Sequence, residues 1–146
     1  MSDWLDEGRI KRQAANRAEI RQLLAVVDRD LADANVRRLS VDRRFTTAYN
    51  AALQLATVVL RASGFRASST SAGHHWVTLA VLPEFMGPEQ QARRVFLDSC
   101  RRARNQADYD RIDVVSKADV EELLEDTLAF RGETLDWLGR EHPELV

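Results

Sequence analysis

Apolar residues recur along this chain with the period of an α-helix, and this pattern constrains the fold more than any other feature. The clearest stretch lies between residues 45 and 60 and forms one wide apolar face. Its members are Phe45, Ala48, Tyr49, Ala52, Leu55, Ala56, Val59 and Leu60. Strict alternation of apolar and polar residues, typical of a half-buried strand, is absent, and β-branched residues are scattered. The pattern therefore predicts an all-α protein.

Capping residues and helix breakers set the expected boundaries of the first two helices. A first helix is expected over residues 6–34, with an apolar stripe from Ile20 to Ala34. After a turn, Ser40 is a favourable N-cap for a second helix, because its hydroxyl can accept a hydrogen bond from a free backbone N–H. Gly64 provides the C-terminal stop of this helix. Residues 65–71 are rich in serine and are predicted to form a loop.

Three more helices are expected in the second half. A short third helix over residues 72–82 should end before Pro83, since a proline disfavours helical geometry in its predecessor. Residues 87–88, Gly-Pro, open a fourth helix whose inner face is predicted to carry Ala92, Val95, Phe96, Ser99, Cys100 and Ala103. Ser116 caps a fifth helix, with Asp119 at the capping-box position. Residues 141–146 are expected to fray.

These elements predict an antiparallel four-to-five-helix bundle, with four main helices and a short accessory one. A chain of 146 residues fits a single domain, residues 1–146, with its core over about 18–138. The single cysteine, Cys100, rules out an internal disulfide and is typical of a reducing, cytoplasmic protein. The acidic N-terminus lacks the apolar run of a secretory signal, and we expect no membrane span.

The charge pattern gives no global sign of a nucleic-acid binder, because the net charge is −2. Basic charge is nevertheless clustered, most densely at Arg101, Arg102 and Arg104. Such arginines can be solvated helix-face residues, or they can bind phosphate through bidentate hydrogen bonds. Glycine-rich phosphate loops and nucleophile elbows are absent. His74 and His75 diverge on a helix, so neither a metal site nor a cofactor is expected.

Residues 101–110, Arg-Arg-Ala-Arg-Asn-Gln-Ala-Asp-Tyr-Asp, concentrate arginine, amide, carboxylate and phenol groups. One interpretation is structural: the fourth helix ends here, arginines lie near the negative end of its dipole, and Asn105 or Asp108 caps the turn. The other interpretation is a ligand site. Its candidate residues are Arg101, Arg104, Asn105, Asp108 and Tyr109, and Arg104, Asp108 and Tyr109 are also the only catalytic candidates.

This stretch resembles the motif of HEPN domains (higher eukaryotes and prokaryotes nucleotide-binding). Members often carry Arg-Asn followed by a histidine and a nearby tyrosine, and residues 104–109 form an Arg-Asn-x-Ala-Asp-Tyr variant of this pattern. Residues 42–52, Asp-Arg-Arg-Phe-Thr-Thr-Ala-Tyr-Asn-Ala-Ala, are similar to the second helix of bacterial members. Together with the order of the helices, the resemblance covers residues 18–138.

The resemblance implies a homodimer in which two copies of the motif face one cleft. In active members an arginine holds the RNA phosphate and a histidine assists the 2′-hydroxyl. Other members are inactive partners of nucleotidyltransferase-like proteins in toxin–antitoxin or phage-defence pairs. Here Tyr109 occupies the histidine position, and a tyrosine with a pKa near ~10 is a poor base at neutral pH.

Three functions remain open on these grounds. The first, which we favour, is a non-catalytic HEPN-like module that binds a nucleotide, RNA or a nucleotidyltransferase-like partner. The second is a metal-independent endoribonuclease in which Arg104 stabilises the scissile phosphate and Asp108 or Tyr109 assists. The third is a structural adaptor whose apolar surfaces bind another helical protein, and pairing of Arg104 with Asp108, which holds the turn without chemistry, would favour it.

Overall fold

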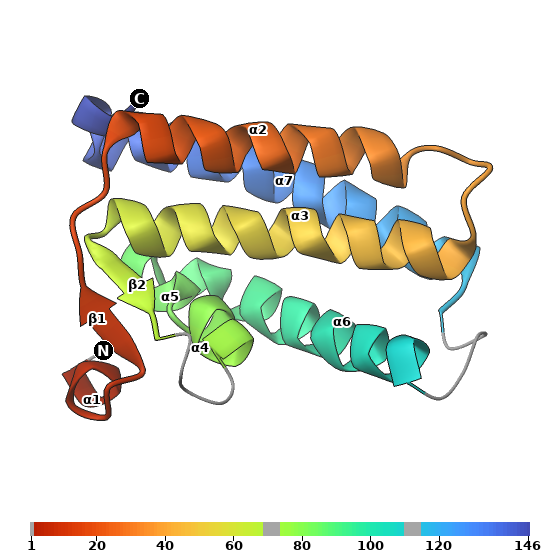
Figure 1. Cartoon of the computed structure of the whole chain (residues 1–146), viewed down its shortest axis with the longest axis horizontal. Helices are drawn as coiled ribbons and strands as arrows, with labels where there is room; N and C mark the ends of the chain where they lie inside the picture. The colour runs from red at the N-terminus through yellow and green to blue at the C-terminus, as the bar shows by residue number, and fades with distance from the viewer. Residues whose placement is uncertain (1, 69–73, 110–114) are drawn as a thin grey trace.

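The computed structural model describes residues 2–68, 74–109 and 115–146. Within these ranges the side chains of residues 2, 74 and 106–109 are not described. In the described part of the chain, four long antiparallel helices form the body of the molecule (Figure 1). They are α2 (Arg17–Ala34), α3 (Val41–Ala62), α6 (Gln91–Tyr109) and α7 (Lys117–Glu141). The prediction of a mostly helical protein is confirmed.

Helix α3 is the central element of the bundle. Helix α2 and helix α6 pack on opposite sides of it, and α7 packs behind it in the view of Figure 1. The whole predicted apolar face of α3 is buried, and Ala48, Tyr49 and Leu55 are fully inaccessible to solvent. The core therefore forms around this helix, because three other long helices cover it.

The predicted capping residues are confirmed at both ends of α3 and at the start of α7. The Ser40 hydroxyl accepts a hydrogen bond from the Arg43 backbone N–H at 3.2 Å. Helix α3 ends at Ala62, and Gly64 follows with a positive φ of 91°. At the start of α7, the Ser116 hydroxyl accepts from the Asp119 N–H at 3.1 Å, and the Asp119 carboxylate accepts from the Ser116 N–H at 2.8 Å. This reciprocal pair is a capping box.

The prediction of one helix over residues 6–34 is wrong at its N-terminal end. A short helix α1 (Ser2–Asp6) is followed by strand β1 (Ile10–Arg12), which pairs antiparallel with strand β2 (Phe65–Ala67). Gly8 between them has a φ of 74°, which interrupts a helix. The expected loop at 65–71 therefore begins with a strand, and residues 69–71 lie outside the described part.

Two further boundaries differ from the prediction. The accessory helix is divided into α4 (His74–Ala80) and α5 (Leu82–Met86), and Pro83 lies in the first turn of α5, where a proline N–H is not needed. A 3₁₀-helix η1 (Pro88–Gln90) leads into α6. At the C-terminus, a second 3₁₀-helix η2 (Pro143–Leu145) packs on α2, and Leu145 is only 7% exposed. The last residues are thus packed where we expected fraying.

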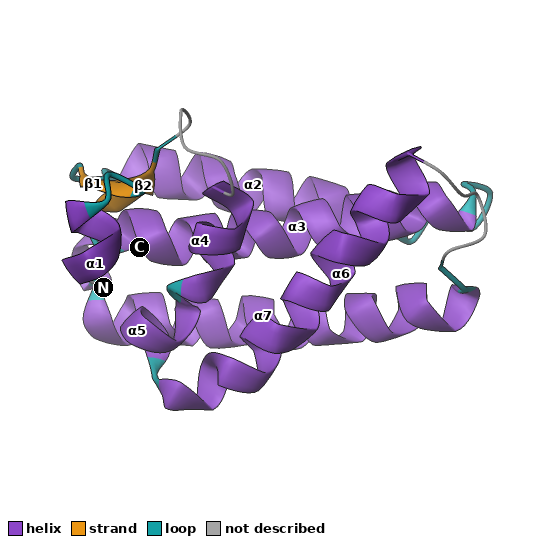
Figure 2. Ribbon diagram, turned by 90° about the horizontal axis from the view of Figure 1, so that it is seen from below, coloured by secondary structure: helices purple, strands orange, loops and turns teal. Residues whose placement is uncertain are grey.

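The predicted inner face of α6 is partly wrong. Leu97 is fully buried, whereas Val95, expected to be inside, is 51% exposed, because residues two positions apart point to nearly opposite sides of a helix. Figure 2 shows that α6 crosses the bundle obliquely and diverges from α7 toward its C-terminal end. In the described ranges, no helix is both long and apolar enough to cross a membrane.

Candidate functional site

Helix α6 continues through Tyr109, the last described residue of this segment, so the prediction that Asn105 or Asp108 caps a turn is wrong. The backbone of Asn105 and of Asp108 is helical, and neither residue caps a turn there. Residues spaced by three or four positions lie on the same side of a helix. The five predicted site positions, 101, 104, 105, 108 and 109, therefore occupy one face of α6.

The structure describes the side chains of three of these five residues. Arg101, Arg104 and Asn105 are all partly buried against the bundle. The side chains of Asp108 and Tyr109 lie outside the described residues, so the predicted pairing of Arg104 with Asp108 lies there too. The described part of the candidate site therefore consists of the side chains between positions 98 and 105 on α6.

Asp98 interacts with two of the arginines on α6. Its Oδ1 accepts a hydrogen bond from Arg101 Nε at 2.9 Å, and its Oδ2 lies 3.8 Å from Arg102 Nε. Arg101 is 24% exposed and Asp98 is 18% exposed, whereas Arg102 is 65% exposed. One carboxylate thus faces two guanidinium groups, which leaves this turn of the helix with net positive charge.

Tyr49 of α3 lies directly beneath this basic turn. The Arg104 guanidinium carbon is 5.7 Å from the centre of the Tyr49 ring, within the range of a cation–π contact. The ring is fully buried, and its hydroxyl has no hydrogen-bond partner among the described residues. Burial raises the pKa of Tyr49 to about 12, against the opposing effect of the positive charges on Arg104 and Arg101. The phenol is therefore protonated and can donate one hydrogen bond.

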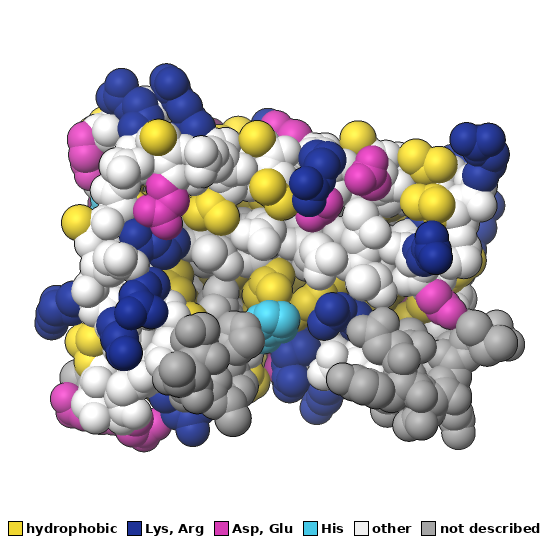
Figure 3. All heavy atoms as spheres, in the orientation of Figure 1, with side chains coloured by type: hydrophobic (Ala, Val, Ile, Leu, Met, Phe, Trp, Pro, Cys, Tyr) yellow, Lys and Arg dark blue, Asp and Glu magenta, His cyan; other side chains and the backbone are white. Residues whose placement is uncertain are grey.

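Helix α4 packs against both α3 and α6. It begins with His74 and His75, and the structure describes the side chain of His75. In Figure 3, a histidine side chain and Lys or Arg side chains lie next to each other at the centre of the molecular face, between the two segments drawn in grey. The sequence contains no signal for this proximity, because it results from tertiary packing.

Tyr49 is the residue of this site that sequence reasoning missed. Its spacing predicts a core residue, and the apolar surface of Phe45, Tyr49 and the fourth helix is also a reason to expect a homodimer. Phe45 and Tyr49 are covered within one chain, with exposures of 3% and 0%, whereas Val95 of α6 is 51% exposed, so only the fourth helix still supports that reason. The signal that could have found Tyr49 is its place in the segment of residues 42–52.

Comparisons with family models, with curated proteins and with solved structures find no match.

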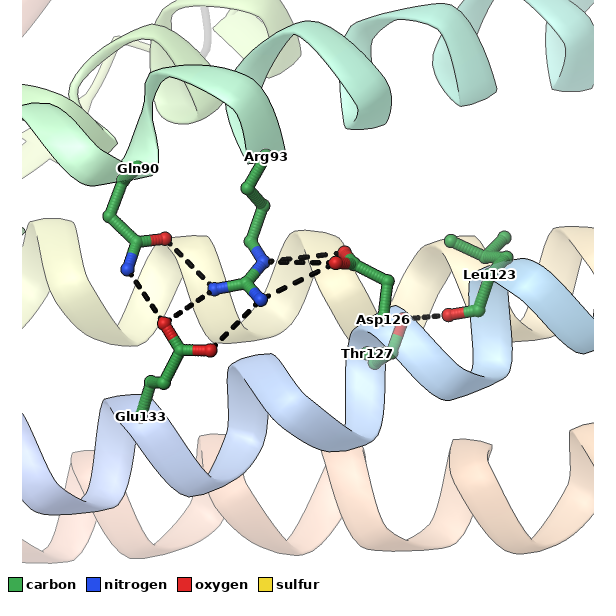
Figure 4. A network of polar contacts seen from close by, with 6 residues as sticks. All are labelled: Gln90, Arg93, Leu123, Asp126, Thr127 and Glu133. Atoms are coloured by element: carbon green, nitrogen blue, oxygen red, sulfur yellow. Dashed lines mark hydrogen bonds and ion pairs between the residues drawn. The ribbon is translucent and has the colours of Figure 1, made fainter.

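A second polar cluster lies near the start of α6 and connects it to α7 (Figure 4). Arg93 donates hydrogen bonds to Glu133 at 3.0 Å, to Gln90 at 2.9 Å and to Asp126 at 3.3 Å. Burial lowers the pKa of Arg93, but the hydrogen bonds to Glu133 and Asp126 more than reverse this effect. Every polar group of the cluster has a partner within it, so we assign it a structural role.

The chemistry that these groups offer is binding. On the basic face, Asp98 is engaged by two arginines and Tyr49 is protonated, so neither is a free base. Among the described residues, no group of three or more His, Cys, Asp or Glu side chains could hold a metal ion. Arg101 and Arg104 supply planar cationic donors, and the Tyr49 hydroxyl supplies a neutral one, which is a set of groups that suits a phosphate.

Proposed function

We propose that the protein is a non-catalytic, HEPN-like module that binds the phosphate of a nucleotide or of RNA on the α6 face. One observation carries the proposal: the buried Tyr49 hydroxyl has no hydrogen-bond partner among the described residues and lies beneath Arg104. A buried polar group without a partner costs free energy, and an acceptor atom of a ligand would recover this once the side chains above the hydroxyl move aside to admit it. Because the neighbouring side chains are cations, the ligand is expected to carry negative charge.

The charges on this face support an anion as ligand. Arg101, Arg102 and Arg104 carry three positive charges, and Asp98 carries the one negative charge among the described side chains of residues 98–105. The overall charge of the chain is −2, so attraction of phosphate would be local to this face. Binding should therefore weaken as salt concentration rises, because bound counterions are released.

The test is a titration of the protein into a fluorescent ATP analogue and into a short fluorescent RNA. Arg104→Ala should weaken binding about tenfold or more, since a bidentate charged contact is lost. Arg104→Lys should restore part of it, because lysine cannot bind with two parallel hydrogen bonds. The matched control is Arg29→Ala on α2, a guanidinium that is 66% exposed. No binding by wild type, or equal loss in the control, would contradict the proposal.

A second candidate function is metal-independent RNA cleavage, and the observation that favours it is the packing of α4 against α6. A histidine from α4 could supply the base that the motif lacks at position 109, because its pKa near ~6.5 suits proton transfer at neutral pH. The test is incubation of labelled RNA with the protein in excess chelator. Cleavage that is lost in both Arg104→Ala and His75→Ala would favour this function over simple binding.

The resemblance to HEPN domains extends the proposal to partners. A homodimer would bring two α6 faces to one cleft, and a nucleotidyltransferase-like protein would complete a toxin–antitoxin or phage-defence pair. Light scattering at micromolar concentration, with and without RNA, tests the first part. A monomer under both conditions would exclude the shared cleft and leave phosphate binding to a single chain.

A further inference from the structure

Next to the basic face of α6 lies a groove whose lining residues the proposed phosphate site does not use. It consists of two adjoining hollows of about 260 and 350 Å³ between α6 and α7, which share Phe96 and Glu122 as lining residues. The floor is apolar and is formed by Phe45, Phe96, Cys100, Ala103 and Val115. The wall on the α7 side is acidic and is formed by Asp119, Glu122, Glu125 and Asp126. We call this feature the α6–α7 groove.

The groove exists because α6 and α7 both pack on α3 more than on each other. The cluster around Arg93 holds the two helices together near the start of α6, and from there they diverge (Figures 2 and 4). The apolar stripe that the sequence predicts for the core of α6 lines this opening. Phe96 is consequently only partly buried, and its neighbour Val95 is 51% exposed. An amphipathic stripe of the helix thus lacks a helix packed over it in the described structure.

The shape of the groove fits a helix. On the α6 side, the lining residues Phe96, Cys100 and Ala103 follow the spacing of one helix face. On the α7 side, the lining runs from Asp119 to Ala129, about 15 Å at ~1.5 Å per residue. Packed helices lie roughly 8–10 Å apart, and a helix in a groove between two others buries an apolar face on both. About three turns of an added helix would match this length.

The negative charge of the groove favours a partner that carries positive charge. Four carboxylates and no lysine or arginine line the two hollows among the described residues. Asp126 is neutralised by Arg93, whereas Glu122 and Glu125 are exposed along the rim. Burial, together with the charges of Asp126, Glu122 and Asp119, raises the pKa of Cys100 on the floor to about 12, against the effect of a side-chain hydrogen bond with Ser99. The negative potential therefore extends into the groove and would repel a nucleic acid.

From this geometry we propose that the α6–α7 groove binds an amphipathic helix of a partner protein, whose apolar face is flanked by lysine or arginine. Apolar side chains of that helix would cover Phe96 and Ala103, and its basic flank would lie along Glu122 and Glu125. The groove lies beside the Arg104 face of α6, and none of the residues that line it belongs to the proposed phosphate site, so the proposal does not depend on phosphate binding. A protein partner and an anionic ligand could then bind to neighbouring faces of one helix.

The experiment uses the full chain and two synthetic helical peptides of equal length with the same leucine face. One peptide has lysines beside that face and the other has glutamates. Fluorescence anisotropy should show binding of the lysine peptide and none of the glutamate peptide. Glu122→Lys with Glu125→Lys should weaken binding about tenfold or more, because two attractive charges become repulsive.

Two further variants separate a groove from general attraction between a basic peptide and an acidic protein. Ser99→Trp changes no charge, and it fills the hollow from an exposed lining position, so it should also weaken binding about tenfold. Glu141→Lys with Glu144→Lys makes the same charge change at side chains that are 55% and 66% exposed near the C-terminus. This control should change affinity by less than about twofold.

Each remaining outcome overturns the proposal. No binding of the lysine peptide to wild type, equal binding of both peptides, or wild-type affinity in Ser99→Trp would show that the groove does not take a basic helix. Equal loss in the C-terminal control would show non-specific attraction. If wild type is a dimer by light scattering and Glu122→Lys with Glu125→Lys makes it a monomer, the occupant is a second copy of the chain. Melting temperatures within a few degrees of wild type confirm that the variants are folded.

Discussion

The guanidinium of Arg104 lies over the buried ring of Tyr49, with 5.7 Å between its carbon and the ring centre. This contact joins a partly buried cation on α6 to a fully buried phenol on α3. The ring packs in the core like any large apolar side chain, while its hydroxyl lacks a hydrogen-bond partner among the described residues. A packing role accounts for the aromatic ring but not for the hydroxyl. A variant that removes only the hydroxyl therefore tests whether that group binds a ligand.

Tyr49→Phe removes only that hydroxyl. Because it has no partner in the described structure, we expect the free energy of unfolding to stay the same or rise by up to about 1 kcal/mol. Phosphate or nucleotide binding should weaken several-fold, since one hydrogen bond to the ligand contributes roughly 0.5–1.5 kcal/mol. Urea unfolding and ligand titration of the same variant measure both quantities. Lower stability with unchanged binding would mean that the hydroxyl is a structural group.

Arg61 provides a second prediction, about the N-terminal segment. Its side chain is 8% exposed and donates hydrogen bonds to the backbone carbonyls of Gln13, Ala14 and Phe65 and to the carboxylate of Glu19. Arg61→Met should lower the free energy of unfolding by about 3 kcal/mol, because it leaves several buried acceptors without a donor. Urea denaturation measures this loss. Arg29→Ala, the exposed control, should change stability by less than about 0.5 kcal/mol.

The pH dependence of stability should depend on Glu133. Hydrogen bonds from Arg93 hold its pKa below the ordinary value of 4.5, and burial opposes this only in part. A carboxyl with a lowered pKa stabilises the folded state above its unfolded pKa and loses that contribution as pH falls below it. Wild type should therefore lose stability below pH 4.5, and Glu133→Gln should lose less over the same range. Parallel melting curves for both proteins at each pH would contradict this role of Glu133.

The parts of the fold that the sequence predicts are those with local causes. The cap at Ser40, the stop at Gly64 and the capping box of Ser116 and Asp119 each involve residues within four positions of one another, so their signals are readable in a short window. The sheet is different. Its strands join residues 10–12 to residues 65–67, and three residues are too few to show alternation. Only the folded chain brings these segments together.

In the candidate site, too, some residues could be predicted from the sequence and others could not. The arginines of α6 are recognisable because basic, amide and carboxylate groups are concentrated in one stretch, whereas Tyr49 has the spacing of an ordinary core residue. Its partner Arg104 lies more than fifty positions away, and no local rule connects the two. The α6–α7 groove was equally hidden, because an apolar stripe predicts burial without saying which helix covers it. Arg93 illustrates the same point, since the carboxylates that neutralise it belong to α7.

The final prediction compares two residues that the sequence treats alike, since both lie on apolar stripes of long helices. Leu124 is 4% exposed in the core, whereas Phe96 is only partly buried and lines the α6–α7 groove. Leu124→Ala should lower the free energy of unfolding by about 3 kcal/mol, because it leaves a cavity. Phe96→Ala should cost roughly half of this or less, since water already reaches one side of the ring. Leu128→Ala, at a 55% exposed position of α7, serves as the control, with an expected change below about 0.5 kcal/mol in urea unfolding. A cost for Phe96→Ala equal to that for Leu124→Ala would mean that the groove is closed in solution.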